Sequence, residues 1–151
     1  MKFGQAIDSV LFKNYFNLQG KATRSEYWWF MLFFLLFNLV AGFVVGIVLA
    51  IALGGDLDPE SFSLYYVLAL FAVFILPLLG LSVRRFHDAG RGTREAIVIF
   101  VLAIISQLIV PIGEQGAIIE VTESMIIPAW IVFASTSLYS LYIALKKSVE
   151  S

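Results

Sequence analysis

Hydrophobic residues in this chain gather into four long stretches that contain no charged side chain. These stretches cover residues 27–55, 61–83, 96–113 and 124–145, with lengths of 29, 23, 18 and 22 residues. A helix rises about 1.5 Å per residue, so about 20 apolar residues cross a hydrocarbon core of about 30 Å. Apolar and polar residues do not alternate along the stretches, as they would in a membrane barrel. The pattern predicts four transmembrane helices, at about residues 27–53, 62–83, 95–112 and 125–145.

The residues before the first stretch have an amphipathic pattern. Apolar side chains recur at steps of three and four between Phe3 and Phe16, with polar side chains elsewhere. This spacing predicts an amphipathic helix over residues 3–17. Its apolar stripe fits two placements equally well, along the cytoplasmic membrane interface or against the end of the helix bundle.

Composition separates the chain from soluble proteins. Of its 151 residues, 60% are hydrophobic and 14% are charged, and the mean hydropathy is +0.92. An average soluble domain is roughly half apolar and about a quarter charged. The composition therefore argues against a soluble enzyme, a nucleic-acid-binding protein and a disordered chain. We expect residues 1–151 to form one all-α, polytopic membrane domain with no nucleic-acid partner.

Lysine and arginine residues are sorted along the chain. They lie before the first stretch, between the second and the third, and after the fourth, whereas the other two connections carry only acidic charges. Because cytoplasmic connections of membrane proteins are rich in lysine and arginine, we expect both termini in the cytoplasm. The ten cations are Lys2, Lys13, Lys21, Arg24, Arg84, Arg85, Arg91, Arg94, Lys146 and Lys147.

The first of two basic motifs lies at the start of the first predicted span. Thr23 and Glu26 have the spacing of a capping box, in which each side chain bonds the backbone N–H of the other residue. A glutamate at this position also suits the positive end of the helix dipole. We therefore expect these two residues to cap the helix rather than to act in catalysis.

The second motif covers residues 83–91, at the end of the second predicted span. If that helix continues into the cytoplasm, Arg84 and Arg85 come within reach of Asp88, at spacings of four and three residues. Gly90 would then end the helix as a C-cap. A salt-bridged helix end that faces anionic lipid explains these residues without any catalysis.

His87 and Asp88 are the only candidates for catalytic residues. They could act as an acid–base pair, but no evident nucleophile stands beside them. A metal site needs several histidine, cysteine or carboxylate ligands, and the chain has one histidine and no cysteine. We expect no metal and no cofactor.

The two motifs together resemble a known family. Residues 20–28 read Gly-Lys-Ala-Thr-Arg-Ser-Glu-Tyr-Trp, and residues 84–91 read Arg-Arg-Phe-His-Asp-Ala-Gly-Arg. This combination resembles the YhaH-type family of small bacterial inner-membrane proteins, a domain of unknown function, over about residues 10–110. The resemblance implies a four-helix protein of the bacterial inner membrane and implies no activity. Residues 92–95 depart from the family pattern, so it assigns no role to Arg94.

Residues 20–24 and 90–94 also match each other, each just before an outward-going helix. A parallel repeat of two helices plus two helices would explain the match, and so would the capping chemistry that helix starts share. Within the first span, Gly42 and Gly46 form a small-residue face that permits close packing of helices, inside one chain or between the chains of a homo-oligomer.

The basic residues suggest a function at the cytoplasmic surface. We expect a membrane interaction module that binds anionic phospholipid head groups or an acidic partner, because arginine forks and helix N-termini both favour phosphate. The residues expected to contribute are Lys21, Arg24, Arg84, Arg85, Arg91 and Arg94.

Two other functions stay open. One is a small oligomeric transporter or channel subunit, associated through Gly42 and Gly46. The other is a membrane enzyme acting on a phospholipid or an isoprenoid phosphate, in which arginines hold the phosphate and His87 and Asp88 serve as acid and base.

Overall fold

A computed structural model describes residues 1–52, 59–112 and 123–149 of the chain. All regular structure in these ranges is helical, which confirms the predicted all-α class. The elements are α1 (Phe3–Asp8), a single π-helical turn η1 (Ser9–Lys13), α2 (Arg24–Ala52), α3 (Pro59–Asp88), α4 (Thr93–Ile112) and α5 (Glu123–Leu145).

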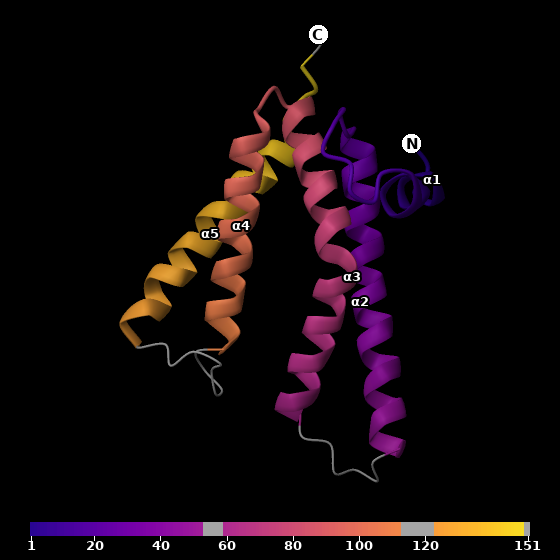
Figure 1. Ribbon diagram of the computed structural model, residues 1–151, viewed down its shortest axis with the longest axis vertical. Helices are drawn as coiled ribbons and strands as arrows, with labels where there is room; N and C mark the ends of the chain where they lie inside the picture. The colour runs from indigo at the N-terminus through magenta and orange to yellow at the C-terminus, as the bar shows by residue number, and fades with distance from the viewer. Residues whose placement is uncertain (53–58, 113–122, 150–151) are drawn as a thin grey trace.

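The four long helices form two hairpins (Figure 1). The first consists of α2 and α3 and the second of α4 and α5. The hairpins meet at the end of the molecule where both chain termini lie, and they diverge toward the opposite end. We call the shared end the basic end and define it as residues 19–26, 84–94 and 145–149.

Three helical segments are long and apolar enough to cross a membrane. They are Arg24–Ala52 in α2, Tyr66–Asp88 in α3 and Ile127–Leu145 in α5. Three of the four predicted spans are thus supported within the part of the chain that the structure describes. The helix α4 has 20 residues, but its side chains are described only as far as Ser106, too few for a span. A fourth crossing through α4 stays a prediction.

The membrane-spanning part of α2 exposes large apolar side chains. Leu39, Phe43 and Ile51 are each at least 70% exposed. A contiguous apolar surface of this kind is unfavourable in water and is typical of a surface that another apolar phase covers. The exposure agrees with a helix surrounded by lipid.

Buried side chains lie mainly toward the basic end, in two clusters. The first joins η1, α2 and α3, and the second joins α3, α4 and α5. Because α3 contributes to both clusters, its C-terminal half is the part against which the other elements pack. The buried residues are Val10, Ala22, Phe30, Phe74 and Leu81 in the first cluster, and Val83, Phe86, Ala89, Ala96 and Ile143 in the second.

The N-terminal helix is shorter than the predicted 3–17. α1 and η1 end at Lys13, and the Asn14 side chain bonds the Ser9 carbonyl in the last turn (3.1 Å). The chain then lies along α3, where the Tyr15 hydroxyl donates to the Val73 carbonyl (2.6 Å). One face is buried through Val10, whereas Phe12 on the other is 78% exposed. The segment therefore packs against the bundle and also presents apolar side chains outward.

Candidate functional site

The basic end is organised around the C-terminus of α3. Gly90 has a φ of +77°, which favours glycine, and it ends the helix. The Arg91 N–H donates to the Phe86 carbonyl (2.8 Å) and the Gly90 N–H to the His87 carbonyl (3.0 Å). These two bonds make a Schellman motif. The helix thus ends at the glycine that the sequence indicates.

Two further segments bond the carbonyl groups at this helix end. The Ala22 N–H, just before α2, donates to the Arg84 carbonyl (3.0 Å). After α5, the Val149 N–H donates to the Asp88 carbonyl (2.9 Å) and Lys146 Nζ to the Ala89 carbonyl (2.9 Å). The Asp88 carbonyl, which the helix end leaves without an intrahelical partner, is satisfied in this way. The same bonds hold residues 22 and 146–149 against α3.

Arg84 pairs with a carboxylate on another helix. Its Nη1 lies 2.9 Å from Glu26 Oε1 of α2, and the two residues are only 3% and 4% exposed. The Ser9 hydroxyl donates to the same carboxylate oxygen (2.9 Å). The sequence suggested an Arg84–Asp88 pair instead. The structure places Arg84 toward α2, because α2 packs beside this turn of α3.

Arg85 forms the predicted pair with Asp88. It is 1% exposed, and its guanidinium also bonds the Ala144 carbonyl (3.2 Å) and the Lys146 carbonyl. The Ser148 hydroxyl donates to Asp88 Oδ2 (2.7 Å). Arg85 therefore connects α3 to the end of α5.

The two buried arginines are matched by two buried carboxylates. Burying a charge is costly unless an opposite charge and hydrogen bonds compensate it. Arg84 and Arg85 are therefore committed to the interior. Binding of a lipid head group, which the sequence suggested for both, requires an accessible guanidinium, and neither provides one.

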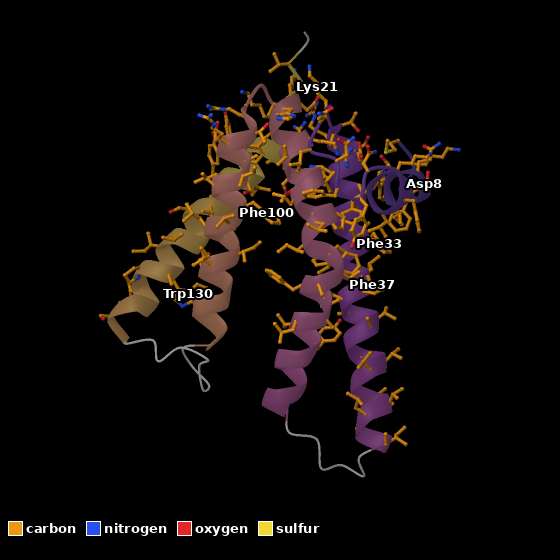
Figure 2. The ribbon with its side chains drawn as sticks, in the orientation of Figure 1. Asp8, Lys21, Phe33, Phe37, Phe100 and Trp130 are labelled. Atoms are coloured by element: carbon orange, nitrogen blue, oxygen red, sulfur yellow. The ribbon has the colours of Figure 1, made fainter. Side chains whose placement is uncertain are left out.

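The other four cations of the predicted site are exposed at the basic end. Arg24 Nη1 reaches the Leu145 carbonyl (3.4 Å), and Lys21 Nζ reaches the Val149 carbonyl (3.3 Å). Arg91 lies 3.8 Å from Glu95 and is 40% exposed. Arg94 is exposed in the first turn of α4. Lys21 marks this end of the molecule in Figure 2.

His87 connects the segment before α2 to the first turn of α4, the two regions around which these cations lie. Its Nδ1 lies 3.1 Å from the Gly20 carbonyl and its Nε2 lies 2.8 Å from the Thr93 hydroxyl. A carbonyl only accepts hydrogen bonds, so Nδ1 carries a proton, and in the neutral ring Nε2 accepts from the hydroxyl. Both ring nitrogens are thus engaged in structural bonds. Neither His87 nor Asp88 is placed as a free acid or base.

The two matching loops have a common local geometry. Gly20 has a φ of +84°, close to the +77° of Gly90, and each precedes a long helix. Thr23 Oγ1 accepts from the Glu26 N–H (3.2 Å), as in an N-cap. The Glu26 carboxylate bonds Ser9 and Arg84 rather than returning to the Thr23 N–H, so only half of the capping box is present.

Gly42 packs within the chain. A Cβ at this position would lie 3.4 Å from the Tyr66 hydroxyl oxygen of α3, and that hydroxyl donates to the Asn38 carbonyl of α2 (2.9 Å). Gly46, one turn further, is half-buried. The small face at Gly42 therefore lets α2 and α3 approach each other, so it does not by itself indicate a homo-oligomer.

Several contacts at or beside the basic end involve residues that the sequence pattern does not indicate. Ser9 and Ser148 bond the buried carboxylates, and the Tyr139 hydroxyl donates to Glu95 across α5 and α4. Ser9 had one available signal, its place on the polar face of the N-terminal pattern. In the described residues no group of three or more histidine or acidic side chains is placed to hold a metal ion.

Comparison with known proteins gives the family. The family model described as "Protein of unknown function (DUF805)" matches residues 15–144. The chain belongs to the DUF805 family. It is 37% identical over 93 residues to inner membrane protein YhaI of Escherichia coli K12, which covers 62% of this chain and 69% of that protein. The same protein from Escherichia coli O157:H7 matches equally. No solved structure matches.

Membership in the DUF805 family confirms the YhaH-type resemblance carried by the two basic motifs. The matched residues contain both motifs and all four long helices except the last residue of α5. With three apolar helices and an inner-membrane relative, the chain is an integral membrane protein of the bacterial inner-membrane type. The DUF805 description assigns no activity.

Proposed function

We propose that this protein crosses the bacterial inner membrane four times, with the basic end in the cytoplasm. Both chain termini lie at one end of the molecule, together with the connection between α3 and α4 (Figure 1). Eight of the ten lysine and arginine residues lie in the basic end, and the other two, Lys2 and Lys13, lie in the N-terminal segment. The charge rule for membrane proteins supports a cytoplasmic location for such an end.

The basic end binds the head groups of anionic phospholipids. The observation that carries this proposal is the division of its cations: Arg84 and Arg85 are neutralised in the interior, whereas Lys21, Arg24, Arg91 and Arg94 are exposed. Arg24 and Arg94 each lie in the first turn of a long helix, where the positive end of the dipole also favours phosphate. His87 bonds Gly20 and Thr93, so it holds the segment with Lys21 beside the start of α4, where Arg94 lies.

Retention of phosphatidylglycerol measures this binding. The variant Arg24→Gln/Arg94→Gln, in nanodiscs of phosphatidylcholine with a minor fraction of phosphatidylglycerol, should lose most phosphatidylglycerol adducts in native mass spectra. Each basic side chain near an anionic surface contributes about 1 kcal/mol, so the two together correspond to a loss of roughly tenfold or more.

A control of equal charge separates a local site from net charge. Lys2→Gln/Lys13→Gln removes two exposed cations from the N-terminal segment, outside the proposed surface. This variant should keep most of its adducts. Equal losses in the two double variants, or no loss in either, would contradict the proposed site.

A further inference from the structure

An apolar cleft lies between the two hairpins, below the basic end. Its volume is about 390 Å³, and its lining comes from α2, α3 and α4. Phe34 of α2, Phe74 and Leu78 of α3, and Phe100 and Ala103 of α4 are among the lining residues. Figure 2 shows Phe100 between α4 and α3. The volume falls in the range of ligand sites in proteins, about 300–1,000 Å³.

The chemistry of the lining suits a hydrocarbon. Asn38 has the one polar side chain among the described residues of the lining, and its amide donates to the Phe34 carbonyl within α2 (2.7 Å). The lining residues of α2 and α3 belong to candidate membrane spans, so lipid chains rather than water surround this level of the molecule.

The dimensions of the cleft limit which kind of molecule can bind in it. Along α3 the lining runs from Val67 to Leu78, which is about 16 Å at about 1.5 Å per residue. A helix with its side chains is about 10–12 Å across, so a helical segment of this length would occupy more volume than the cleft offers. A single hydrocarbon chain fits.

The position of the cleft relative to the exposed cations selects the kind of lipid. On α4, Phe100 lies six residues beyond Arg94, about 9 Å along the helix. A phospholipid whose phosphate lies at Arg94 places its glycerol and the first part of its acyl chains across this distance. Along the helix axis, the exposed cations of the basic end and the apolar cleft are thus within reach of the two parts of one phospholipid molecule.

We propose that the cleft between the hairpins holds one acyl chain of the anionic phospholipid whose head group lies at the basic end. This inference rests on the proposed function and adds to it the place of the hydrocarbon. The lipid is then part of the packing between the hairpins, with α3 and α4 on either side of its chain.

Photo-crosslinking of the full chain in nanodiscs tests the proposal. The probe is phosphatidylglycerol with a diazirine near the middle of one acyl chain, and phosphatidylcholine with the same chain is compared in parallel. Adducts located by peptide mass spectrometry should concentrate on residues 67–78 and 100–104. The yield from phosphatidylglycerol should exceed that from phosphatidylcholine several-fold.

A cleft-filling variant and a matched control sharpen the test. Ala103→Trp fills the cleft and should lower the adducts at residues 67–78 several-fold. Ala134→Trp introduces the same side chain at an exposed position of α5 and should leave them unchanged. The adduct map of the unaltered chain tests the proposal even if Ala103→Trp does not fold.

The experiment distinguishes failure of the acyl-chain site from failure of the proposed head-group binding. Adducts spread over the exposed faces of the helices, or protein–protein crosslinks between copies at the cleft, would overturn the acyl-chain site even if phosphatidylglycerol were still preferred. Adducts in the cleft at equal yield from both lipids would support the acyl-chain site and overturn the proposed head-group selectivity.

Discussion

At the scale of single residues, the charged side chains of the basic end have two different tasks. Arg84 and Arg85 join α3 to α2 and to the end of α5 through buried carboxylates. Lys21, Arg24, Arg91 and Arg94 remain exposed and carry the positive charge of the surface. The two neighbouring arginines of the second motif are therefore structural, and the exposed cations lie in the segments around the starts of α2 and α4.

Removal of Glu26 should destabilise the fold strongly. Glu26→Ala leaves Arg84 buried without a counter-charge, and breaking a buried ion pair from one side typically costs about 3–5 kcal/mol. The free energy of unfolding, measured by SDS titration in mixed micelles, should fall by this order. The double variant Glu26→Leu/Arg84→Met, which removes both charges, should recover most of the loss.

An exposed ion pair provides the control for Glu26. Lys13 Nζ lies 2.6 Å from Asp8 Oδ2, but the two side chains are 71% and 49% exposed. Pairs of this kind contribute about 0–1 kcal/mol. If Asp8→Asn lowered the free energy of unfolding as much as Glu26→Ala does, burial of the ion pair would not explain the effect at Glu26.

The partner of Arg84 was beyond what the sequence could predict. Helical spacing indicates only partners on the same helix, so it predicted Asp88 for both arginines and was right for Arg85. The pairing with Glu26 depends on which turn of α2 lies beside which turn of α3. The same limit applies to Ser148, whose position follows from the docking of residues 146–149.

At the scale of elements, Gly80 determines where the N-terminal segment lies. A Cβ at this position would lie 3.2 Å from the Asn17 carbonyl oxygen and 3.5 Å from its nitrogen. The absence of a side chain lets the backbone of residues 14–17 run against α3. The loop with Lys21 follows this contact directly, so Gly80 also positions the first part of the cationic surface.

Gly80→Val should displace the N-terminal segment. The new side chain overlaps backbone atoms that cannot move independently, and overpacking typically costs about 1–3 kcal/mol. Amide hydrogen exchange of residues 14–22, measured by mass spectrometry in nanodiscs, should become faster. Gly4→Val in α1, where a Cβ meets nothing within 4 Å, should leave their exchange unchanged. Equal rates of amide exchange for residues 14–22 in the two variants would contradict the role assigned to the contact at Gly80.

The elements that hydrophobic stretches define were predictable, and the N-terminal segment was not. Each predicted span coincides with one of α2–α5, because long apolar stretches form helices wherever water is absent. The helix predicted over residues 3–17 ends at Lys13 in the structure. Hydrophobic periodicity holds no information on the hydrogen bond of the Asn14 side chain or on the backbone contact at Gly80. Likewise, Gly42 was correctly placed on a packing face, but its neighbour Tyr66 depends on the tertiary arrangement.

At the scale of the whole molecule, the proposals depend on one orientation. The basic end must lie at a membrane surface with anionic lipid, and the hairpins must extend from it into the bilayer. The two connections at the other end carry no lysine or arginine, as expected for segments moved across the membrane. The proposed head-group binding and the proposed acyl-chain site both depend on this orientation.

Labelling of single cysteines tests the orientation most directly, because the chain has no cysteine of its own. Gly92→Cys lies at the basic end, in an open position, and Glu114→Cys lies in the connection between α4 and α5. A membrane-impermeant maleimide added to spheroplasts should label Glu114→Cys at once and Gly92→Cys only after lysis. Labelling of both from the same side would contradict the crossing by α4 and, with it, the account of the basic end.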